Sequence, residues 1–175
     1  MTKQLIMVVV ASVVCLSSCG RGKQATAPAS QVTAETPVAE LKDRDFEIME
    51  YVLRRWPDLG TNRVYYLTTT PMRQWGGTGN WQDLPDSFHK KIADLPVTYH
   101  KASEALLSNH WVVDRKTGSG GWMLWVTVKK WISDTEVEVE TGVWSAPLGG
   151  GANTAIYEKV GDDWRIKKLG ESWVS

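Results

Sequence analysis

The sequence predicts an α+β domain in which helices pack on a curved antiparallel sheet that ends in a C-terminal β-meander. The first observation is a helical spacing of apolar residues around position 50. The second is a pair of alternating, hairpin-like patterns in the C-terminal third of the chain. The third is the order of the patterns, in which helix, strand and helix precede a run of antiparallel strands. Residues 42–175 fit one such domain.

The first 18 residues predict an export signal. Lys3 supplies a positive start, and Leu5 to Leu16 form an uncharged, mostly apolar run. This run is too short for a membrane-spanning helix, which needs about 20 apolar residues. It suits the apolar region of a secretory signal, which ends at small residues such as Ser17 and Ser18.

Both cysteines of the chain lie in its first nineteen residues. The tetrapeptide Leu16-Ser17-Ser18-Cys19 resembles the lipobox of bacterial lipoproteins. The resemblance implies that Cys19 is the first residue of the mature chain and carries acyl chains such as palmitate, which together anchor it stably to a membrane. Gly20, where an Asp would favour inner-membrane retention, implies the outer membrane, facing the periplasm, in a Gram-negative cell. The alternative is a plain export signal in which Cys19 is incidental, and Cys15 is an apolar residue of the signal.

Residues 19–41 predict a lipidated cysteine followed by a flexible tether. The segment is rich in Ala, Thr, Pro, Gln and Ser and has no aromatic residue, so it cannot bury enough surface to offset its ordering entropy. Removal of the signal removes one basic residue and leaves 19 basic and 20 acidic residues in the mature chain. These charges are interspersed, which excludes the basic stripe of a nucleic-acid-binding protein.

Residues 43–56 predict the first helix, because apolar residues recur at helical spacing and Asp43 can cap its start. Residues 62–70 are rich in β-branched and aromatic residues and predict a strand. The glycines and prolines of residues 71–85 predict a long loop. A second helix is expected to run to about Leu95, with Asp86 as its cap. The apolar faces of the two helices are Phe46, Met49, Val52, Leu53 and Trp56, then Phe88, Ile92 and Leu95.

Short strands are expected at residues 97–101 and 110–114. A hairpin then turns at Ser133-Asp134, and a second one turns at Gly161-Asp162. In the first, the pairs would be Leu124–Val143, Val126–Thr141 and Val128–Val139 on an apolar face, and Thr127–Glu140, Lys129–Glu138 and Trp131–Glu136 on a charged face. In the second, they would be Tyr157–Ile166 and Glu158–Arg165.

The element order and the ending YEKVGDDWRIKKLGESWV resemble nuclear-transport-factor-2-like and cystatin-like rolls. The resemblance spans residues 42–174 and implies a cystatin-like roll, with a pocket between the helices and the concave face of the sheet. The stretch DTEVEVETGVWSAPLGGG also resembles a segment of exported bacterial proteins of unknown function, which implies no activity.

The candidate pocket residues are histidines, tyrosines and one acid, because these side chains transfer protons in rolls of this kind: Tyr65, Tyr66, Tyr99, His100, His110 and Asp114. His89 is expected on the surface. No histidine has metal-ligand spacing, and no cofactor motif is present. Neither Gly118–Gly121 nor Gly149–Gly151 fits a serine-nucleophile or phosphate-loop pattern, so both are predicted to be β-turns that need positive φ.

Ten tryptophans are the unusual feature of the composition. Trp56, Trp122 and Trp164 fit core positions. Trp75 and Trp81 lie in the long loop, and Trp125 and Trp131 fall on the charged face of the first hairpin. Such tryptophans can stack on sugar rings or anchor an interface. The alternative is that they are covered by other parts of the chain.

The sequence therefore favours a lipid-anchored cell-envelope protein that acts as a non-catalytic binding or protein-interaction module. Its partner would be an envelope protein or a glycan such as peptidoglycan. The alternative is a small-molecule enzyme or binder that uses the roll cavity. A third possibility, a structural part of an assembly, would show an exposed apolar patch.

Overall fold

A computed structural model describes residues 40–56, 63–72 and 81–174. The chain divides into two compact units, Met1–Val38 and Ala39–Ser175, and every described residue belongs to the second. The expected signal peptide, Cys19, all but the last residues of the tether, and Trp75 lie outside the described residues.

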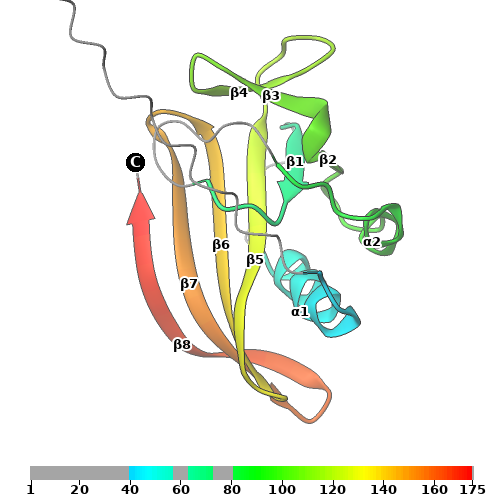
Figure 1. Cartoon of the computed structure of the whole chain (residues 1–175), viewed down its shortest axis with the longest axis vertical. Coiled ribbons are helices and arrows are strands. Elements are labelled where there is room, and N and C mark those ends of the chain that lie inside the picture. Colours follow the sequence, from blue (N-terminus) through cyan, green and yellow to red (C-terminus); the bar gives the residue numbers. More distant parts are fainter. Residues whose placement is uncertain (1–39, 57–62, 73–80, 175) are drawn as a thin grey trace, which may run out of the picture. The chain divides into compact units, whose positions relative to one another are not determined.

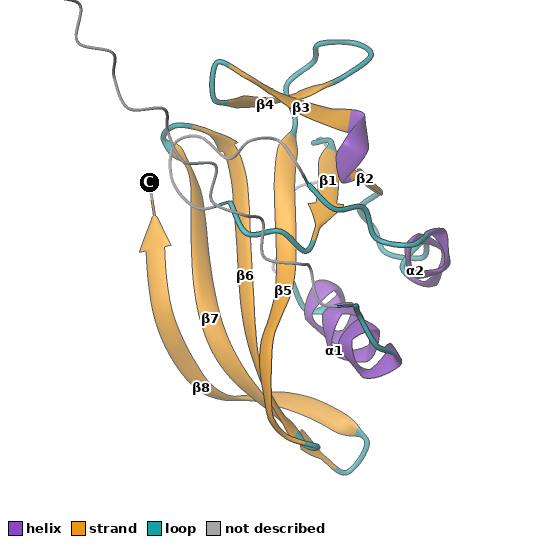
Figure 2. Cartoon of the chain, viewed as in Figure 1, coloured by secondary structure: helices purple, strands orange, loops and turns teal. Residues whose placement is uncertain are grey.

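The second unit holds two α-helices and eight strands among its described residues (Figures 1 and 2). A six-stranded sheet has the order β2-β1-β5-β6-β7-β8, and β3 and β4 form a separate antiparallel pair. The elements are α1 (Asp43–Arg54), β1 (Tyr65–Thr68), α2 (Asp86–Lys91), β2 (Tyr99–Lys101), a short 3-10 helix (Ala102–Glu104), β3 (Ala105–Ser108), β4 (Trp111–Asp114), β5 (Trp122–Ser133), β6 (Glu136–Ala146), β7 (Gly149–Val160) and β8 (Asp163–Val174).

The predicted α+β class and the C-terminal β-meander are confirmed, since β5 to β8 pair in order as antiparallel neighbours. The expectation of a purely antiparallel sheet is wrong. Strand β1 pairs in parallel with both β2 and β5. The connection through α2 explains the β1–β2 pairing, because parallel neighbours need a crossover, which is usually helical.

Both helices begin as the sequence suggests, but neither predicted cap is correct. Asp43 and Asp86 are the first helical residues and follow the caps Lys42 and Pro85. The acid that serves the first helix is Asp45, whose Oδ2 accepts the backbone N–H of Lys42 at 2.8 Å. An acid at the third helical position thus satisfies a free N–H at the helix start. The second helix stops at Lys91, short of Leu95, because the backbone leaves the α region at residue 92.

The predicted register of the β5–β6 hairpin is confirmed away from the turn and wrong near it. Leu124, Val126 and Val128 pair with the expected residues of β6. Closer to the turn, β5 carries two irregularities. After the first, Lys130 pairs with Glu138 and Trp131 with Val137; after the second, Ser133 pairs with Glu136. Each bulge adds one residue to β5, so the turn moves to residues 134–135 and the predicted Lys129–Glu138 and Trp131–Glu136 pairs do not form.

The β7–β8 hairpin has the predicted register, with Tyr157 opposite Ile166 and Glu158 opposite Arg165. Its turn glycine has φ of +64°, and Gly118 has φ of +71° as expected for the other turn. The expectation of a β-turn at Gly149–Gly151 is wrong, because these residues begin β7. Glycine is needed there for space, since a Cβ on Gly150 would lie 2.4 Å from the Trp144 ring.

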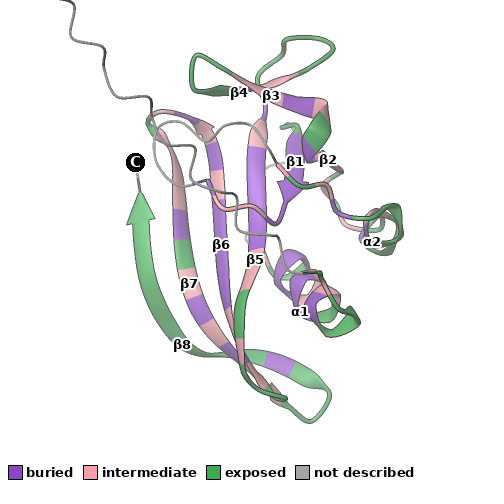
Figure 3. Ribbon diagram, viewed as in Figure 1, coloured by how far each residue is buried: buried purple, intermediate pink, exposed green. Residues whose placement is uncertain are grey.

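Side chains on the two faces of the sheet enter two separate hydrophobic clusters. Along β5, Leu124 and Val126 join the cluster that includes α1 and α2, and Met123 and Trp125 join the cluster that includes β3 and β4. Alternation along a strand places these two sets on opposite faces, here called the helix side and the far side. Strand β8 is exposed along nearly its whole length, with Trp164 its buried residue (Figure 3).

Candidate binding cavity

The structure brings together three of the predicted pocket residues, from β1, β2 and β4. The hydroxyl of Tyr66 donates to Asp114 Oδ2 at 2.8 Å. The ring of His100 lies 5.8 Å from the Tyr66 ring, centre to centre. Its Nδ1 is 3.4 Å from Oε2 of Glu104. This cluster contains the side-chain types of an acid–base site, so its protonation decides what it can do.

Asp114 organises the turn that follows β4. Its Oδ1 accepts the backbone N–H groups of Lys116 and Thr117 and the Thr117 hydroxyl. The Tyr66 hydroxyl, and then the Thr117 groups, lower the pKa of Asp114 to about 2. Burial, helped by Asp114, raises the pKa of Tyr66 well above its usual value. Near neutral pH Asp114 therefore stays ionised and Tyr66 protonated, which suits a structural hydrogen bond better than proton transfer.

Tyr99 and Tyr65 face each other across β1 and β2, with ring centres 6.2 Å apart. Burial raises the pKa of Tyr99 to about 12. His89 is only partly exposed, and its Nδ1 lies 3.2 Å from the carbonyl oxygen of Tyr99. These residues join α2 to the sheet edge.

His110 lies in the tight β3–β4 turn and not in a strand as expected. It and Asn109 have φ of +68° and +50°, the conformation that a two-residue hairpin turn requires. The side chain is exposed, and the backbone carbonyl accepts the indole N–H of Trp144 at 3.2 Å.

Trp125 has no exposed surface, so its ring offers no face to a sugar. The indole stacks on Trp173 with ring centres 6.4 Å apart, and its N–H is 3.4 Å from Glu140 Oε1. A Cβ on Gly142 would lie 2.0 Å from this ring, so that position needs glycine. Trp81 is partly buried against the far-side hydrophobic cluster, to which Trp125 belongs.

Trp131 lies on the helix side, and its expected place on the charged face is wrong. The bulge at residue 129 reverses the alternation of β5 and turns this side chain toward α1. Its indole N–H donates to Asp45 Oδ1 at 2.7 Å, and the Arg44 guanidinium lies 4.4 Å from the ring centre. Trp164 is buried as expected, whereas Trp56 and Trp122 are only partly buried.

A cavity of about 750 Å³ lies between the C-terminal end of α1 and strands β6 to β8. The volume is in the range of small-molecule sites. Three aromatic and three aliphatic side chains contribute to the lining, with threonine, asparagine and serine on the sheet. The lining residues are Tyr51, Val52, Arg55, Trp56, Thr141, Asn153, Thr154, Tyr157, Arg165, Ile166, Leu169, Gly170 and Ser172.

The cavity has a fixed inner part and an open side. Tyr51 and Tyr157 meet edge to face, with ring centres 6.2 Å apart, and the Tyr51 hydroxyl donates to the backbone carbonyl of Trp164. On β8, Ile166 is 53% and Leu169 is 70% exposed. Apolar side chains thus face solvent along the β8 side of the cavity.

Among the described residues, the lining carries two arginines and no acid. Arg165 is paired, because its Nη2 lies 2.8 Å from Oε1 of Glu158. The Arg55 guanidinium lies 4.3 Å from the centre of the Tyr51 ring. Within the described residues, no carboxylate pairs with Arg55, so its charge is available to a ligand.

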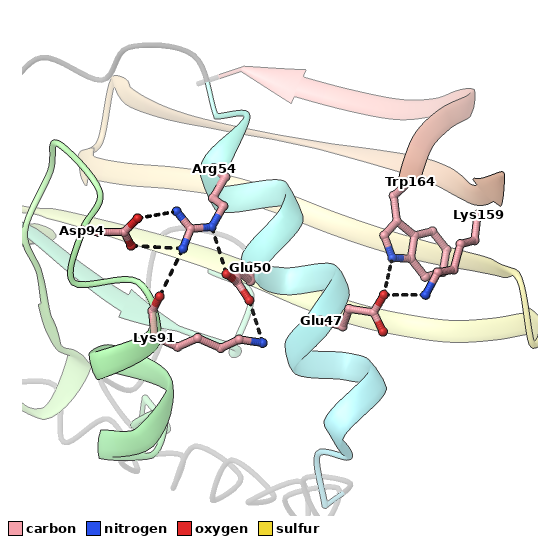
Figure 4. Close-up of polar contacts among 7 residues, drawn as sticks. All are labelled: Glu47, Glu50, Arg54, Lys91, Asp94, Lys159 and Trp164. Atoms are coloured by element: carbon pink, nitrogen blue, oxygen red, sulfur yellow. Dashed lines mark hydrogen bonds and ion pairs between the residues drawn. The ribbon is translucent and has the colours of Figure 1, made fainter. Parts of the chain in front are cut away.

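Polar contacts hold α1 in place as the wall of this cavity (Figure 4). Toward α2, Arg54 pairs with Asp94 at 2.9 Å and Glu50 pairs with Lys91 at 2.6 Å. Within α1, Arg54 and Glu50 also pair with each other at 2.9 Å.

Toward the β7–β8 hairpin, Glu47 accepts from Lys159 at 2.7 Å and from the Trp164 indole at 3.1 Å. The Lys159 bond is the main reason that the pKa of Glu47 is lowered. The helix is therefore tied to the same two strands that complete the cavity.

A second hollow, of about 480 Å³, lies on the far side and mixes charges of both signs. Lys129, Glu140, Lys168 and Glu171 are among its lining residues. Lys129 Nζ is 3.3 Å from Glu140 Oε2. The other charged lining residues, Glu138, Lys168 and Glu171, are again of both signs.

In residues 40–56, 63–72 and 81–174, no group of His, Cys, Asp or Glu is arranged to hold a metal ion. Neither α1 nor α2 is long and apolar enough to cross a membrane. No family model, curated protein or solved structure matches the chain.

The resemblance predicted a pocket between the helices and the sheet, but sequence reasoning named none of the residues that line this cavity as pocket candidates. The candidate residues lie on β1, β2, β4 and β5 and in loops, whereas the described lining comes from the end of α1 and from the meander. Two signals pointed to the cavity: Arg54-Arg55 closes an amphipathic helix, and Ile166 and Leu169 are apolar residues that flank two lysines on one strand. Neither shows that the two segments are neighbours.

Proposed function

We propose that this chain is a lipid-anchored cell-envelope protein whose α+β domain is a non-catalytic binding module, with its ligand in the cavity between α1 and β8. The observation that carries this proposal is the open cavity of about 750 Å³, whose described residues give it an aromatic and aliphatic lining with two arginines and no acid. Such a combination of apolar surface and a few polar groups is typical of ligand sites.

The choice of binding over catalysis is supported by the positions of the titratable groups. Tyr66, His100 and Asp114 gather outside the cavity lining. Inside it, burial raises the pKa of Tyr157. A group with a pKa near neutral would suit proton transfer better.

The proposed class of fold is a cystatin-like roll with a curved sheet. Its support is the order of helix, short strands and long meander, together with α1 packed on the meander. The proposed anchor is Cys19, supported by the lipobox-like Leu16-Ser17-Ser18-Cys19, with the outer membrane favoured by Gly20. Peptidoglycan or an envelope protein is a weaker proposal for the partner, because Trp125 is buried and Trp131 is only partly exposed.

The binding proposal predicts that a neutral apolar dye, N-phenyl-1-naphthylamine, becomes fluorescent with residues 20–175, the mature sequence without its lipidated residue. Ser172→Trp should weaken dye binding at least tenfold, because the new ring occupies the cavity that Ser172 lines. The control is Lys168→Trp on the same strand, whose side chain lines the opposite face. Dye binding that Ser172→Trp leaves unchanged, or no dye binding at all, would refute a ligand site here.

A further inference from the structure

We propose that the ligand is a single-chain amphiphile with an anionic head, whose chain lies along β8 and whose head binds Arg55. This inference rests on the proposed function and names the ligand class for the same cavity. It has two parts, one for the apolar chain and one for the charge.

The apolar part follows from the side chains that line the open side. Val52 is buried at the inner end, and Ile166 and Leu169 continue the apolar surface outward along β8 at 53% and 70% exposure. An extended alkyl chain would cover these side chains along their row and remove them from water. A compact polar ligand would leave them exposed.

The charged part follows from the difference between the two arginines. Glu158 holds Arg165, whereas Arg55 contacts the face of Tyr51. Tyr51 is itself fixed by its bond to the Trp164 carbonyl. A guanidinium that rests on a fixed ring is oriented in advance, and its planar set of donors fits a carboxylate or a phosphate.

Arg55 is also the C-cap of α1, where the helix dipole is negative and disfavours an anion. Its positive charge is therefore required for anion binding, because the other positive charge that the described lining residues supply is the paired Arg165. Removal of this charge should abolish the preference for an anion and leave binding of the apolar chain.

The test measures displacement of N-phenyl-1-naphthylamine from residues 20–175 by dodecanoate, by its neutral methyl ester and by a lysophosphatidate, all below their micelle concentrations. We expect dodecanoate to bind about tenfold more tightly than the ester, as a charged hydrogen bond implies. Arg55→Gln should remove that preference. The matched control is Arg44→Gln, since Arg44 also lies on α1 over an aromatic ring, that of Trp131, outside the cavity; it should keep the full preference.

The outcomes separate the two proposals. Tighter binding of either anion than of the ester, dependent on Arg55, supports the inference, and the stronger anion identifies a carboxylate or a phosphate head. Equal binding of ester and anions overturns the anionic ligand but leaves an apolar binding site. A preference that Arg55→Gln retains overturns the assignment of the head group to Arg55. Failure of every compound, the dye included, defeats the proposed function as well.

Discussion

Two glycines leave room for large aromatic rings on the far side of this sheet. Gly142 and Gly150 lie against the rings of Trp125 and Trp144, where a Cβ would come within 2.0 Å and 2.4 Å of a ring atom. The far-side cluster can hold these large rings because the facing residues have no side chain. The sequence shows the tryptophans and the glycines, but their matching depends on cross-strand register.

Ionisation of Asp114 should make the free energy of unfolding depend on pH in the acid range. Its pKa is lowered from 3.8 to about 2, first by the Tyr66 hydroxyl, so the folded state binds the proton less readily than the unfolded state. The stabilisation is therefore present above about pH 4 and is lost as pH falls toward 2. Asp114→Asn should be less stable than the unaltered protein at pH 7 and nearly equal to it at pH 2, as measured by urea unfolding at several pH values.

The control for this experiment is Asp162→Asn, at an exposed position in the β7–β8 turn. It should change the free energy of unfolding little at any pH. A difference between Asp114→Asn and the unaltered protein that stays constant from pH 7 to pH 2 would show that the carboxylate charge contributes nothing.

At the scale of elements, the bulge in β5 decides where α1 attaches. The extra residue turns Trp131 to the helix side, where its indole donates to Asp45 near the start of α1. Local sequence predicted both the helix and the hairpin, because apolar spacing and turn residues are local signals. It could not predict the bulge, since the alternation of β5 is equally regular without it.

Trp131→Phe should keep most of the ring packing and lose the bond to Asp45, a carboxylate that is only 8% exposed. A hydrogen bond to a charged group contributes about 1.5–3 kcal/mol, so we expect a loss of that order in the free energy of unfolding. Trp111→Phe, at a position that is 53% exposed, is the control and should cost less than about 0.5 kcal/mol. Equal effects of the two substitutions would mean that the Asp45 bond does not stabilise the attachment of α1.

The parallel pairing of β1 was also beyond local reasoning. Its four residues are fully buried between β2 and β5, a pattern typical of strands covered on both faces. The burial was readable from the run Tyr65 to Thr68, but strand direction depends on how α2 and the β3–β4 pair return the chain.

At the scale of the whole molecule, the cavity needs residues as far apart in the sequence as Tyr51 and Ser172. The sequence predicted the α+β class and the C-terminal meander, since these depend on the order of local patterns. It predicted a pocket only through a resemblance, and it placed the pocket residues elsewhere. A site assembled from a helix end and a distant hairpin depends on tertiary packing that no local pattern specifies.

The proposed anchor predicts that Cys19, and not Cys15, carries the lipid. In a Gram-negative host that expresses the full chain, labelled palmitate should be incorporated into the unaltered protein and into Cys15→Ser. Cys19→Ser should lose the label, because the thiol is the proposed site of the thioether. Label that persists in Cys19→Ser would contradict the lipoprotein proposal.

The most direct test of the central claim is where a single-chain anion binds. Methyl NMR spectra of residues 20–175, labelled at Ile, Leu and Val, would be recorded during titration with dodecanoate. The account predicts shifts of the Val52, Ile166 and Leu169 methyl signals, which line the cavity, and none for Ile156, which lines the far-side hollow. Shifts centred on Ile156, or none at the three cavity residues, would contradict the assignment of the binding site.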